Sequence, residues 1–320
     1  MIEIRKDYLL DRYIILATER AKRPNDFIQQ NNNISPKETC PFCPENEAMV
    51  PKIYDEIKEE GKWIIRSVQN KYSAVGNEFT SDLRTDNKFF TFASAYGNHE
   101  VIVETREHNK EIEDFSYEHI QNIIKMYIKR IKALNDLPHI KYVTLFKNKG
   151  KEAGASIAHA HSQIIAYNVL PTEVENELLA SYKYYIENES CAFCDIIKIE
   201  KNSYRRVMEN DSFLAFTPYA SRFPFEIWIF PKRHIPTITD LNEKEIADLA
   251  VALKFIFTKL NKLNHPPYNM LFHNAEPQGE NFHFHIEICP RLSIWAGFEL
   301  STGATINTIT PEDAAAFYRE

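Results

Sequence analysis

The chain has 320 residues, which is enough for one large domain or two domains of ordinary size. Its apolar fraction of 44% and charged fraction of 26% are those of a folded soluble protein, and no apolar run is long enough to span a membrane. The net charge of −7 argues against general binding to nucleic acids, which depends on clustered Lys and Arg. The first residues are charged where a secretion signal needs an apolar stretch, so we expect a cytoplasmic protein.

A basic segment follows the first predicted strand and contains Arg20 and Arg23 before Pro24. Such a segment is usually a solvated loop, but it is also the local positive cluster that an anionic ligand requires. A polar loop then leads to Cys40 and Cys43, the first of two Cys-x-x-Cys pairs. In a cytosolic chain these pairs indicate metal or redox chemistry, and the absence of a βαβ pattern around them favours metal.

Three further strands and one helix are predicted in the N-terminal half. Strands are expected at 62–68 and 99–105, with Asn70 at the exit of the first, and a third at 141–148. Between the second and the third, apolar residues recur at helical spacing after Ser116, which is a good N-cap. This half therefore combines strands with one long amphipathic helix.

A His-x-His motif, His159 and His161, follows the small residues Gly154 to Ser156 and precedes Gln163. Residues two apart in a strand point to the same face, so both imidazoles are expected to face one site. Both could bind a metal, or one could bind a metal while the other performs chemistry. The pair could also be two histidines of a half-buried strand.

The second half repeats the order of the first: a Cys-x-x-Cys pair, a strand, a histidine, a capped helix, another strand and a His-x-His motif. Matching residues stand at nearly constant separation, and they are His108 and His234, Ser116 and Asn242, and His159 and His283. We therefore predict an α+β fold of two tandem repeats, residues 1–171 and 172–320, each an antiparallel sheet with one long helix. The longer first half predicts an insertion within 44–98.

Each half offers two thiols, a histidine after a strand and the first histidine of a His-x-His motif. Four such ligands suit a closed, tetrahedral zinc site. The predicted ligands are Cys40, Cys43, His108 and His159 in the first half, and Cys191, Cys194, His234 and His283 in the second. The fifth cysteine, Cys289, lies in an apolar, strand-like run and is predicted to be a core residue.

If His159 binds zinc, His161 is left beside it as a neutral imidazole that can attack phosphorus. Attack on the α-phosphorus of a nucleotide would give a covalent nucleotidyl-histidine, and a phosphorylated acceptor would then take the nucleotidyl group. Gln163 shares the strand face and can donate to a phosphate oxygen. In the second half Glu287 stands two residues after His285, in the place of Gln163, and a carboxylate cannot donate and would repel a phosphate. We therefore assign the chemistry to the first half.

The run from Phe146 to Gln163 resembles the active-site segment of galactose-1-phosphate uridylyltransferases, which belong to the histidine-triad superfamily. The segment around Arg20 and Arg23 is similar to the family's sugar-phosphate-binding motif, and Asn70 stands in a run similar to its nucleoside-contacting motif. Other runs in the family's order are Phe223 to Glu226, Pro231 to His234 and Gly297 to Glu299.

The resemblance implies two histidine-triad-like repeats with half-barrel sheets, a homodimer, and a ping-pong reaction through a uridylyl-His161 intermediate. It implies that Arg20, Arg23, Asn148, Ser156 and Gln163 bind phosphates, that Gly154 and Ser162 also line the substrate site, that Asn70 contacts the nucleoside, and that Phe298 and Glu299 contact the hexose across the dimer interface. The substrates implied are UDP-glucose and a hexose 1-phosphate, most simply galactose 1-phosphate.

Three features depart from this pattern. Ser162 stands where many uridylyltransferases have Gly, and the C-terminal run from Gly297 to Asn307 is more similar to the ADP-glucose phosphorylase branch. The alternative activities are therefore an ADP-sugar phosphorylase with phosphate as acceptor, and a hydrolase; a zinc-stabilised nucleotide-binding protein is the non-enzymatic alternative. Some family members also use a Glu and three His for the second metal, which here would be Glu177, His273, His283 and His285.

Overall fold

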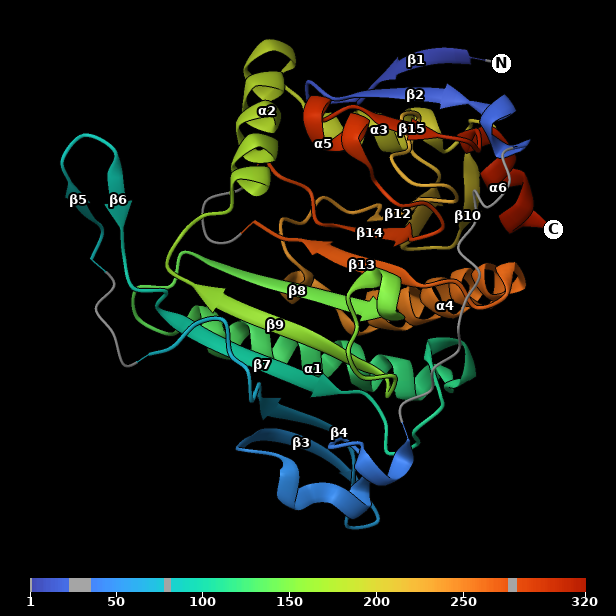
Figure 1. Cartoon of the computed structure of the whole chain (residues 1–320). Coiled ribbons are helices and arrows are strands. Elements are labelled where there is room, and N and C mark those ends of the chain that lie inside the picture. The colour runs from blue at the N-terminus through green and yellow to red at the C-terminus, as the bar shows by residue number, and fades with distance from the viewer. Residues whose placement is uncertain (1, 23–35, 78–81, 276–280) are drawn as a thin grey trace.

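The computed structural model describes residues 2–22, 36–77, 82–275 and 281–320 of the chain (Figure 1). Arg23, one of the predicted phosphate ligands, lies outside these ranges. Within them, no helix is both long enough and apolar enough to cross a membrane.

One antiparallel sheet of ten strands runs through the molecule (Figure 1). From one edge to the other its strands are β10 (Arg206–Glu209), β11 (Phe213–Phe216), β12 (Ile227–Pro231), β14 (His285–Pro290), β13 (Tyr268–His273), β8 (Tyr142–Lys149), β9 (His161–Tyr167), β7 (Gly97–Val103), β4 (Lys62–Gln69) and β3 (Ile53–Glu59). The order is mirrored about the central pair β8 and β13, so β9 and β14, which carry the two His-x-His motifs, occupy equivalent places. The predicted α+β architecture of two repeats is confirmed.

Two long helices, α1 (Tyr117–Asn135) and α4 (Glu243–Leu260), cover one face of the sheet and contact each other (Figure 1). Both begin where their caps predict: the Ser116 hydroxyl accepts from the backbone of His119, and Asn242 forms a capping box with Glu245. Their apolar faces pack on the sheet and form the main hydrophobic core. Because side chains alternate along a strand, His161 and Gln163 of β9 lie on the opposite face from this core.

Seven further helices and strands flank the C-terminal half. They are β1 (Ile2–Lys6), β2 (Tyr13–Ala17), β15 (Thr305–Asn307), α2 (Thr172–Asn188), α3 (Ala192–Glu200), α5 (Gly297–Thr302) and α6 (Pro311–Arg319). Strand β2 pairs antiparallel with β1 and parallel with β15, so the N-terminal residues hydrogen bond to the end of the chain. The predicted domain boundary between residues 171 and 172 stays a prediction. Strands β1 and β2 come before that boundary in the sequence but lie in one sheet with β15, which comes after it.

A separate two-stranded hairpin, β5 (Arg84–Asp86) and β6 (Phe90–Phe92), projects from the body of the molecule (Figure 1). It lies between β4 and β7, inside the stretch 44–98 where the sequence predicts an insertion. At the equivalent place in the second half, the connection between β11 and β12 contains no strand.

Candidate functional site

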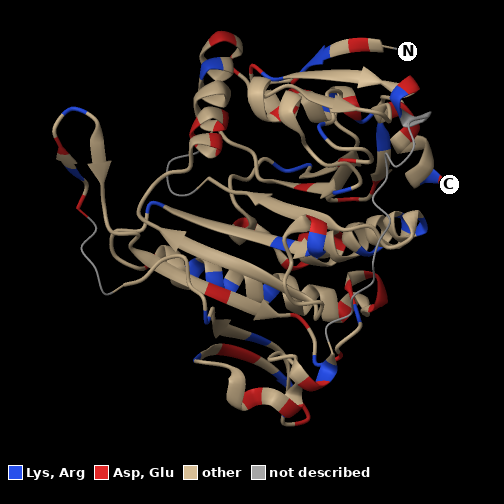
Figure 2. Ribbon diagram, viewed as in Figure 1, with Lys and Arg blue, Asp and Glu red and all other residues tan. Residues whose placement is uncertain are grey.

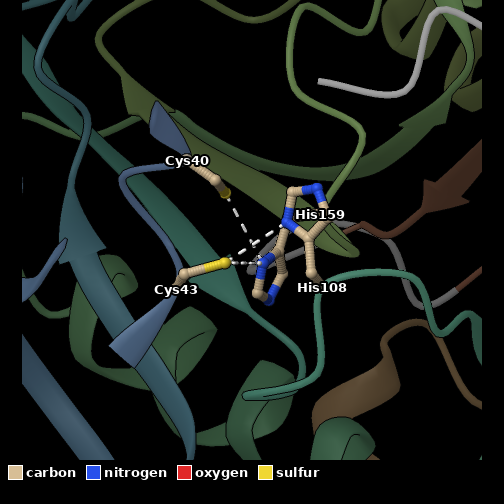
Figure 3. Close-up of side chains that lie close together, drawn as sticks. All are labelled: Cys40, Cys43, His108 and His159. Carbon is tan, nitrogen blue, oxygen red and sulfur yellow. Dashed lines mark hydrogen bonds between the residues drawn. The ribbon is translucent and has the colours of Figure 1, made fainter. Parts of the chain in front are cut away.

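The four predicted ligands of the first half converge in one buried cluster (Figure 3). The sulfur of Cys43 lies 3.3 Å from Nδ1 of His108 and 3.6 Å from Nδ1 of His159, and the sulfur of Cys40 lies 3.6 Å from the same His159 nitrogen. A tetrahedral Zn²⁺ with bonds of about 2.0 to 2.3 Å would separate its ligand atoms by roughly 3.5 Å. The observed separations fit that geometry.

The chemistry of this cluster also fits a cation. Burial and the neighbouring Cys40 raise the pKa of Cys43 to about 12, so a cation is needed to hold the thiolate at neutral pH. His159 donates through Nε2 to the backbone oxygen of Thr105 at 2.8 Å, which leaves Nδ1 unprotonated toward the sulfurs. The four side chains could therefore hold a zinc ion.

The second set of Cys and His ligands forms a similar cluster that is more exposed. The sulfur of Cys194 lies 3.4 Å from Nδ1 of His234 and 3.5 Å from Nδ1 of His283, and Cys191 completes the group. His283 donates through Nε2 to the backbone oxygen of Pro231 at 2.8 Å, the counterpart of the His159 contact. The repeat has thus kept both the ligands and their orienting hydrogen bonds.

The alternative ligand set for the second metal, Glu177, His273, His283 and His285, is wrong in one member, His283. Glu177, His273 and His285 do cluster, but their fourth neighbour is Glu287, because His283 turns toward the cysteines instead. His285 stacks on His273 with ring centroids 4.4 Å apart. The second half therefore contains two separate clusters rather than two versions of one.

In the cluster of Glu177, His273, His285 and Glu287, cationic side chains of the protein balance the negative charges of the two carboxylates. His273 lies 2.9 Å from a Glu177 oxygen and 3.5 Å from a Glu287 oxygen, and Arg222 forms an ion pair with Glu287. Burial lowers the pKa of His273, but the two carboxylates outweigh burial and raise it to about 10. Glu287, which stands in the place of Gln163 of the first half, thus forms ion pairs with two cationic neighbours, Arg222 and His273.

His161 is the first residue of β9, and one of its two ring nitrogens forms a hydrogen bond within the chain. It donates through Nδ1 to the backbone oxygen of His159 at 2.7 Å, which leaves the Nε2 lone pair for chemistry. Burial lowers the pKa of His161, and this keeps the imidazole neutral. Phe42, from the Cys-x-x-Cys segment, contacts both imidazole rings. The structure thus places His159 in the Cys and His cluster and leaves His161 outside it with Nε2 uncommitted.

The amide of Gln163 is oriented by a histidine that the sequence analysis missed. Ala74 donates its backbone N–H to Nδ1 of His99, so the His99 proton sits on Nε2, which donates to Gln163 Oε1 at 2.9 Å. Asn70 Nδ2 lies 3.0 Å from His99 Nε2, but that nitrogen carries a proton and cannot accept. The Asn70 amide therefore donates to Gln163 Oε1, at 3.4 Å. The Gln163 oxygen is thus occupied, and its NH2 group has no partner among the described residues.

The loop before the His-x-His motif faces the same side of the sheet. Phe146 of β8 lies opposite Gln163, and Asn148 is two residues further along that face. Asn269 of β13 donates to Asn148 Oδ1 at 2.8 Å, so the second half orients a side chain of the first. Gly154 has φ = +87°, a conformation that favours glycine.

Three other predicted substrate residues lie on elements of their own. Arg20 is in a 3-10 turn, Thr18–Lys22, that follows β2. Phe298 and Glu299 are in α5, where Glu299 accepts from the backbone of Ala296. No hydrogen bond or ring contact joins them to β9 in the part of the chain that the structure describes, so their contact with substrate stays a prediction.

The assignment of Ser162 to the substrate is wrong. Its side chain is fully buried on the helix face of the sheet, because it alternates with His161 and Gln163. The hydroxyl donates to Glu104 Oε1 at 2.5 Å and lies 2.7 Å from the hydroxyl of Tyr127. The Ser162 side chain therefore anchors β9 to Glu104 and Tyr127 on the helix face of the sheet and does not contact a ligand on the other face.

Glu104 is a fully buried carboxylate whose charge is balanced by a buried lysine. Lys147 Nζ lies 2.6 Å from Glu104 Oε2 and 2.9 Å from Glu111 Oε2. Burial raises the pKa of Glu104, but the Lys147 charge and hydrogen bonds from Lys147, Ser162 and Tyr127 outweigh it and lower the pKa. The sequence analysis missed this network because Glu and Lys in strands usually face solvent.

We expect Lys147→Met to lower the free energy of unfolding by about 3 to 5 kcal/mol, since it leaves Glu104 charged and uncompensated in the core. Ser162→Ala should cost less, about 1.5 to 3 kcal/mol, because Glu104 keeps two donors. Urea unfolding followed by circular dichroism measures both. The control is Lys129→Met, which removes an exposed ion pair with Asp55 and should cost about 0 to 1 kcal/mol; an equal effect of Lys147→Met would contradict the network's importance.

Known proteins are similar to this chain over nearly its whole length. Residues 2–171 match the family described as galactose-1-phosphate uridyl transferase, N-terminal domain, and residues 177–319 match its C-terminal domain. The ADP-glucose phosphorylase of Arabidopsis thaliana is 34% identical over 329 residues, covering 99% of this chain and 92% of the relative. The galactose-1-phosphate uridylyltransferase of Thermotoga maritima is 32% identical over 333 residues, covering 100% and 98%.

Solved structures agree over the whole length. The crystal structure of the Arabidopsis thaliana ADP-glucose phosphorylase with bound ADP-glucose aligns with a TM-score of 0.86 at 33% identity, covering 100% of this chain and 99% of that one. A structure of a uridylyltransferase aligns with a TM-score of 0.77 at 31% identity, covering 100% and 97%. With both halves matched in order, the chain belongs to the galactose-1-phosphate uridylyltransferase family.

Proposed function

We propose that the protein is a nucleotidyltransferase that moves a nucleoside monophosphate from a nucleotide sugar to a hexose 1-phosphate, with UDP-glucose and galactose 1-phosphate as the best-supported pair. The observation that carries this proposal is the pair His161 and Gln163 on one strand face. The first offers a free ring nitrogen, and the second offers an amide NH2 group. The family of the chain and the uridylyltransferases among its relatives support the uridine nucleotide.

The reaction proceeds through two displacements at the α-phosphorus. The Nε2 lone pair of His161 forms a bond to phosphorus, and the bond from phosphorus to the bridging oxygen breaks, so that hexose 1-phosphate leaves with the electron pair. A phosphate oxygen of the second hexose 1-phosphate then attacks the nucleotidyl-histidine and returns the electron pair to Nε2. The His159 oxygen accepts from Nδ1 throughout and stabilises the positive ring of the intermediate. Gln163 donates to the oxygens on which charge builds.

A second candidate is an ADP-sugar phosphorylase, in which inorganic phosphate replaces hexose 1-phosphate as the acceptor. Two observations favour it: the Arabidopsis thaliana relative of that name matches nearly the whole chain, and Ser162 stands where many uridylyltransferases have Gly. Ser162 is buried on the helix face of the sheet, so its side chain does not distinguish the two bases by contact. The choice of base and acceptor therefore rests on a direct measurement.

Intact-mass spectrometry of the enzyme after incubation with UDP-glucose or ADP-glucose tests both candidates. We expect a gain of one UMP that galactose 1-phosphate discharges; a gain of AMP that phosphate discharges would establish the phosphorylase instead. His161→Asn should abolish the gain, and the matched second-half variant His285→Asn should keep it if the fold is retained by circular dichroism. Labelling of His161→Asn, or no labelling of the native enzyme by either sugar nucleotide, would contradict the proposal.

Substitutions at Gln163 test the role of its NH2 group. Gln163→Ala removes one donor to the charged oxygens and should slow nucleotidyl transfer about a hundredfold to a thousandfold. Gln163→Glu, which copies the second half, should slow it further because a carboxylate repels the phosphate. Rapid-quench measurement of the labelled intermediate gives both rates. A Glu variant that is as fast as the Ala variant would show that charge at this position is unimportant.

We also propose that both Cys and His clusters bind Zn²⁺ and that the protein works in the cytoplasm, where its thiols stay reduced. The support is the tetrahedral spacing of ligand atoms and their soft donor set. Cys40→Ser should remove about one zinc per chain, measured by inductively coupled plasma mass spectrometry, and should lower the melting temperature. Cys289→Ser, which alters a buried thiol outside both clusters, should keep the full zinc content; an equal loss of zinc there would refute the ligand assignment.

A further inference from the structure

The loop that follows β8, residues 150–155, is held by the second half of the chain. Gly150 has φ = +83°, and a Cβ added there would lie 2.7 Å from Cβ of Pro267, so the loop passes very close to the residue before β13. The side chain of Asn269, in β13, donates to the backbone oxygen of Ala153 at 2.9 Å. The loop before the His-x-His motif is therefore fastened to β13 at two places.

Asn148 of β8 faces the same space as the proposed nucleophile. Strands β8 and β9 pair antiparallel, and the last pair of that ladder is Phe146 with Gln163 (Figure 1). Asn148 follows Phe146 by two residues, and His161 precedes Gln163 by two residues, so both side chains leave the same face at the same end of the strand pair. The Asn148 amide is thus placed to reach a phosphate that His161 attacks.

Two hydrogen bonds fix the direction in which the Asn148 amide points. A guanidinium can only donate, and Arg291 Nη1 donates to Asn269 Oδ1 at 3.2 Å. The Asn269 amide must therefore turn its NH2 group to Asn148, and it donates to Asn148 Oδ1 at 2.8 Å. The Asn148 oxygen is then occupied, and its NH2 group, which has no partner among the described residues, is left for a ligand. These three side chains are here called the amide relay.

Arg291, where the amide relay begins, is itself held firmly. Its backbone N–H donates to the oxygen of Pro267 at 2.7 Å, next to the point that the loop approaches. Its guanidinium lies 5.2 Å from the ring centroid of Phe223 and 6.0 Å from that of Trp295, and these two rings stack 5.1 Å apart. A planar guanidinium that rests on two aromatic rings loses little further freedom when it hydrogen bonds.

The positive charge of Arg291 is not neutralised by a carboxylate. Figure 2 shows basic and acidic residues together where β8 ends and its loop begins, and Lys149 there lies 3.3 Å from a Glu113 oxygen. The side-chain hydrogen bond of Arg291 goes instead to a neutral amide, and within the described ranges of the chain Arg291 forms no ion pair. Because a hydrogen bond from a charged donor is stronger than one between neutral groups, the relay has a defined direction from its first member onward.

We propose that Asn269 and Arg291 are positioning residues for the reaction at His161. Arg291 orients the Asn269 amide, Asn269 orients the Asn148 amide, and the NH2 group thus directed donates to an oxygen of the transferred phosphate. With Gln163, the phosphate then has two amide donors, one from β8 and one from β9. This inference rests on the proposed nucleotidyl transfer, and it gives the second half of the chain a part in the reaction of the first.

Asn269→Asp tests the direction of the amide relay with almost no change in shape. The new carboxylate still accepts from Arg291, but it cannot donate, so the Asn148 amide turns its NH2 group away from the phosphate and its oxygen toward it. Rapid-quench measurement should show labelling of His161 slowed about a hundredfold or more. Asn269→Ala, which removes the bond without reversing it, should slow labelling less. The urea midpoint should fall more for Asn269→Ala, because the ion pair formed with Arg291 in Asn269→Asp offsets the lost bond to Ala153.

Variants of Arg291 test the need for a group that can only donate. Arg291→Lys keeps such a cation and should stay within about fivefold of the native labelling rate, whereas Arg291→Gln, whose amide can also accept, should slow labelling about tenfold. The matched control is Arg319→Gln, which removes a guanidinium that donates to the backbone oxygen of Tyr204, outside the amide relay. It should keep the native rate. Equal rates for Arg291→Lys and Arg291→Gln would contradict the relay.

A double variant separates positioning from a general effect on the fold. Asn148→Ala with Asn269→Asp should label as slowly as Asn148→Ala alone, because no amide is then left to orient; a further loss in the double variant would overturn the inference. Labelling of Asn269→Asp that is no slower than that of Asn269→Ala would overturn it as well, while leaving the proposed function intact. A native protein that neither UDP-glucose nor ADP-glucose labels would instead refute the proposed function and this inference with it.

Discussion

Three hydrogen bonds hold the His-x-His segment to the two residues that follow β7. The backbone N–H of Glu104 donates to Ala160 at 3.1 Å, its carboxylate accepts from Ser162, and the Thr105 oxygen accepts from His159. His159, Ala160 and Ser162 are therefore all held by one dipeptide, Glu104 and Thr105. Displacing that dipeptide would move the proposed zinc ligand His159 and the proposed nucleophile His161 together, and a shift of about 1 Å in a reacting group can cost a hundredfold in rate. The buried Lys147 keeps Glu104 ionised, so the whole arrangement depends on one ion pair behind the sheet.

The second half shows what this backbone keeps when the chemistry is lost. Its His-x-His segment makes the same internal contact, from His285 Nδ1 to the His283 oxygen at 3.0 Å, and its Cys and His cluster has the same spacing. The change lies in charge: Glu287 takes the place of the amide donor, and Arg222 and His273 occupy the carboxylate that results. The Cys and His cluster and the strand pairing are alike in both halves. A carboxylate in place of the amide would repel the phosphate of a second substrate.

Much of the fold and of the metal clusters could be predicted from local pattern. The caps at Ser116 and Asn242 and the helical spacing after them indicated α1 and α4, and the repeated order of ligands indicated two equivalent clusters. Contacts that depend on strand order could not be read in this way. Glu104 and Lys147 are far apart in sequence, and only the pairing of β7, β9 and β8 brings them together.

The error at Ser162 has a different cause, since alternation along the strand already placed it opposite His161. The resemblance to a family motif outweighed that geometric argument and assigned it to the substrate. The pairing of β2 with β15 could not be predicted, because nothing in either short strand specifies a partner at the other end of the chain.

The orientation of Gln163 depends on the loop that carries Asn70, the proposed nucleoside contact. The loop after β4 supplies the Asn70 amide and the Ala74 N–H, and both act on the pair formed by His99 and Gln163. Burial lowers the pKa of His99, so its single proton stays on the nitrogen that faces Gln163. A nucleoside that changed the position of this loop would therefore also change the direction in which the Gln163 amide donates. With the roles proposed for Asn70 and Gln163, contact with the base and donation to the phosphate are joined through the neutral imidazole of His99, and a nucleotide whose base fits poorly would be transferred slowly as well as bound weakly.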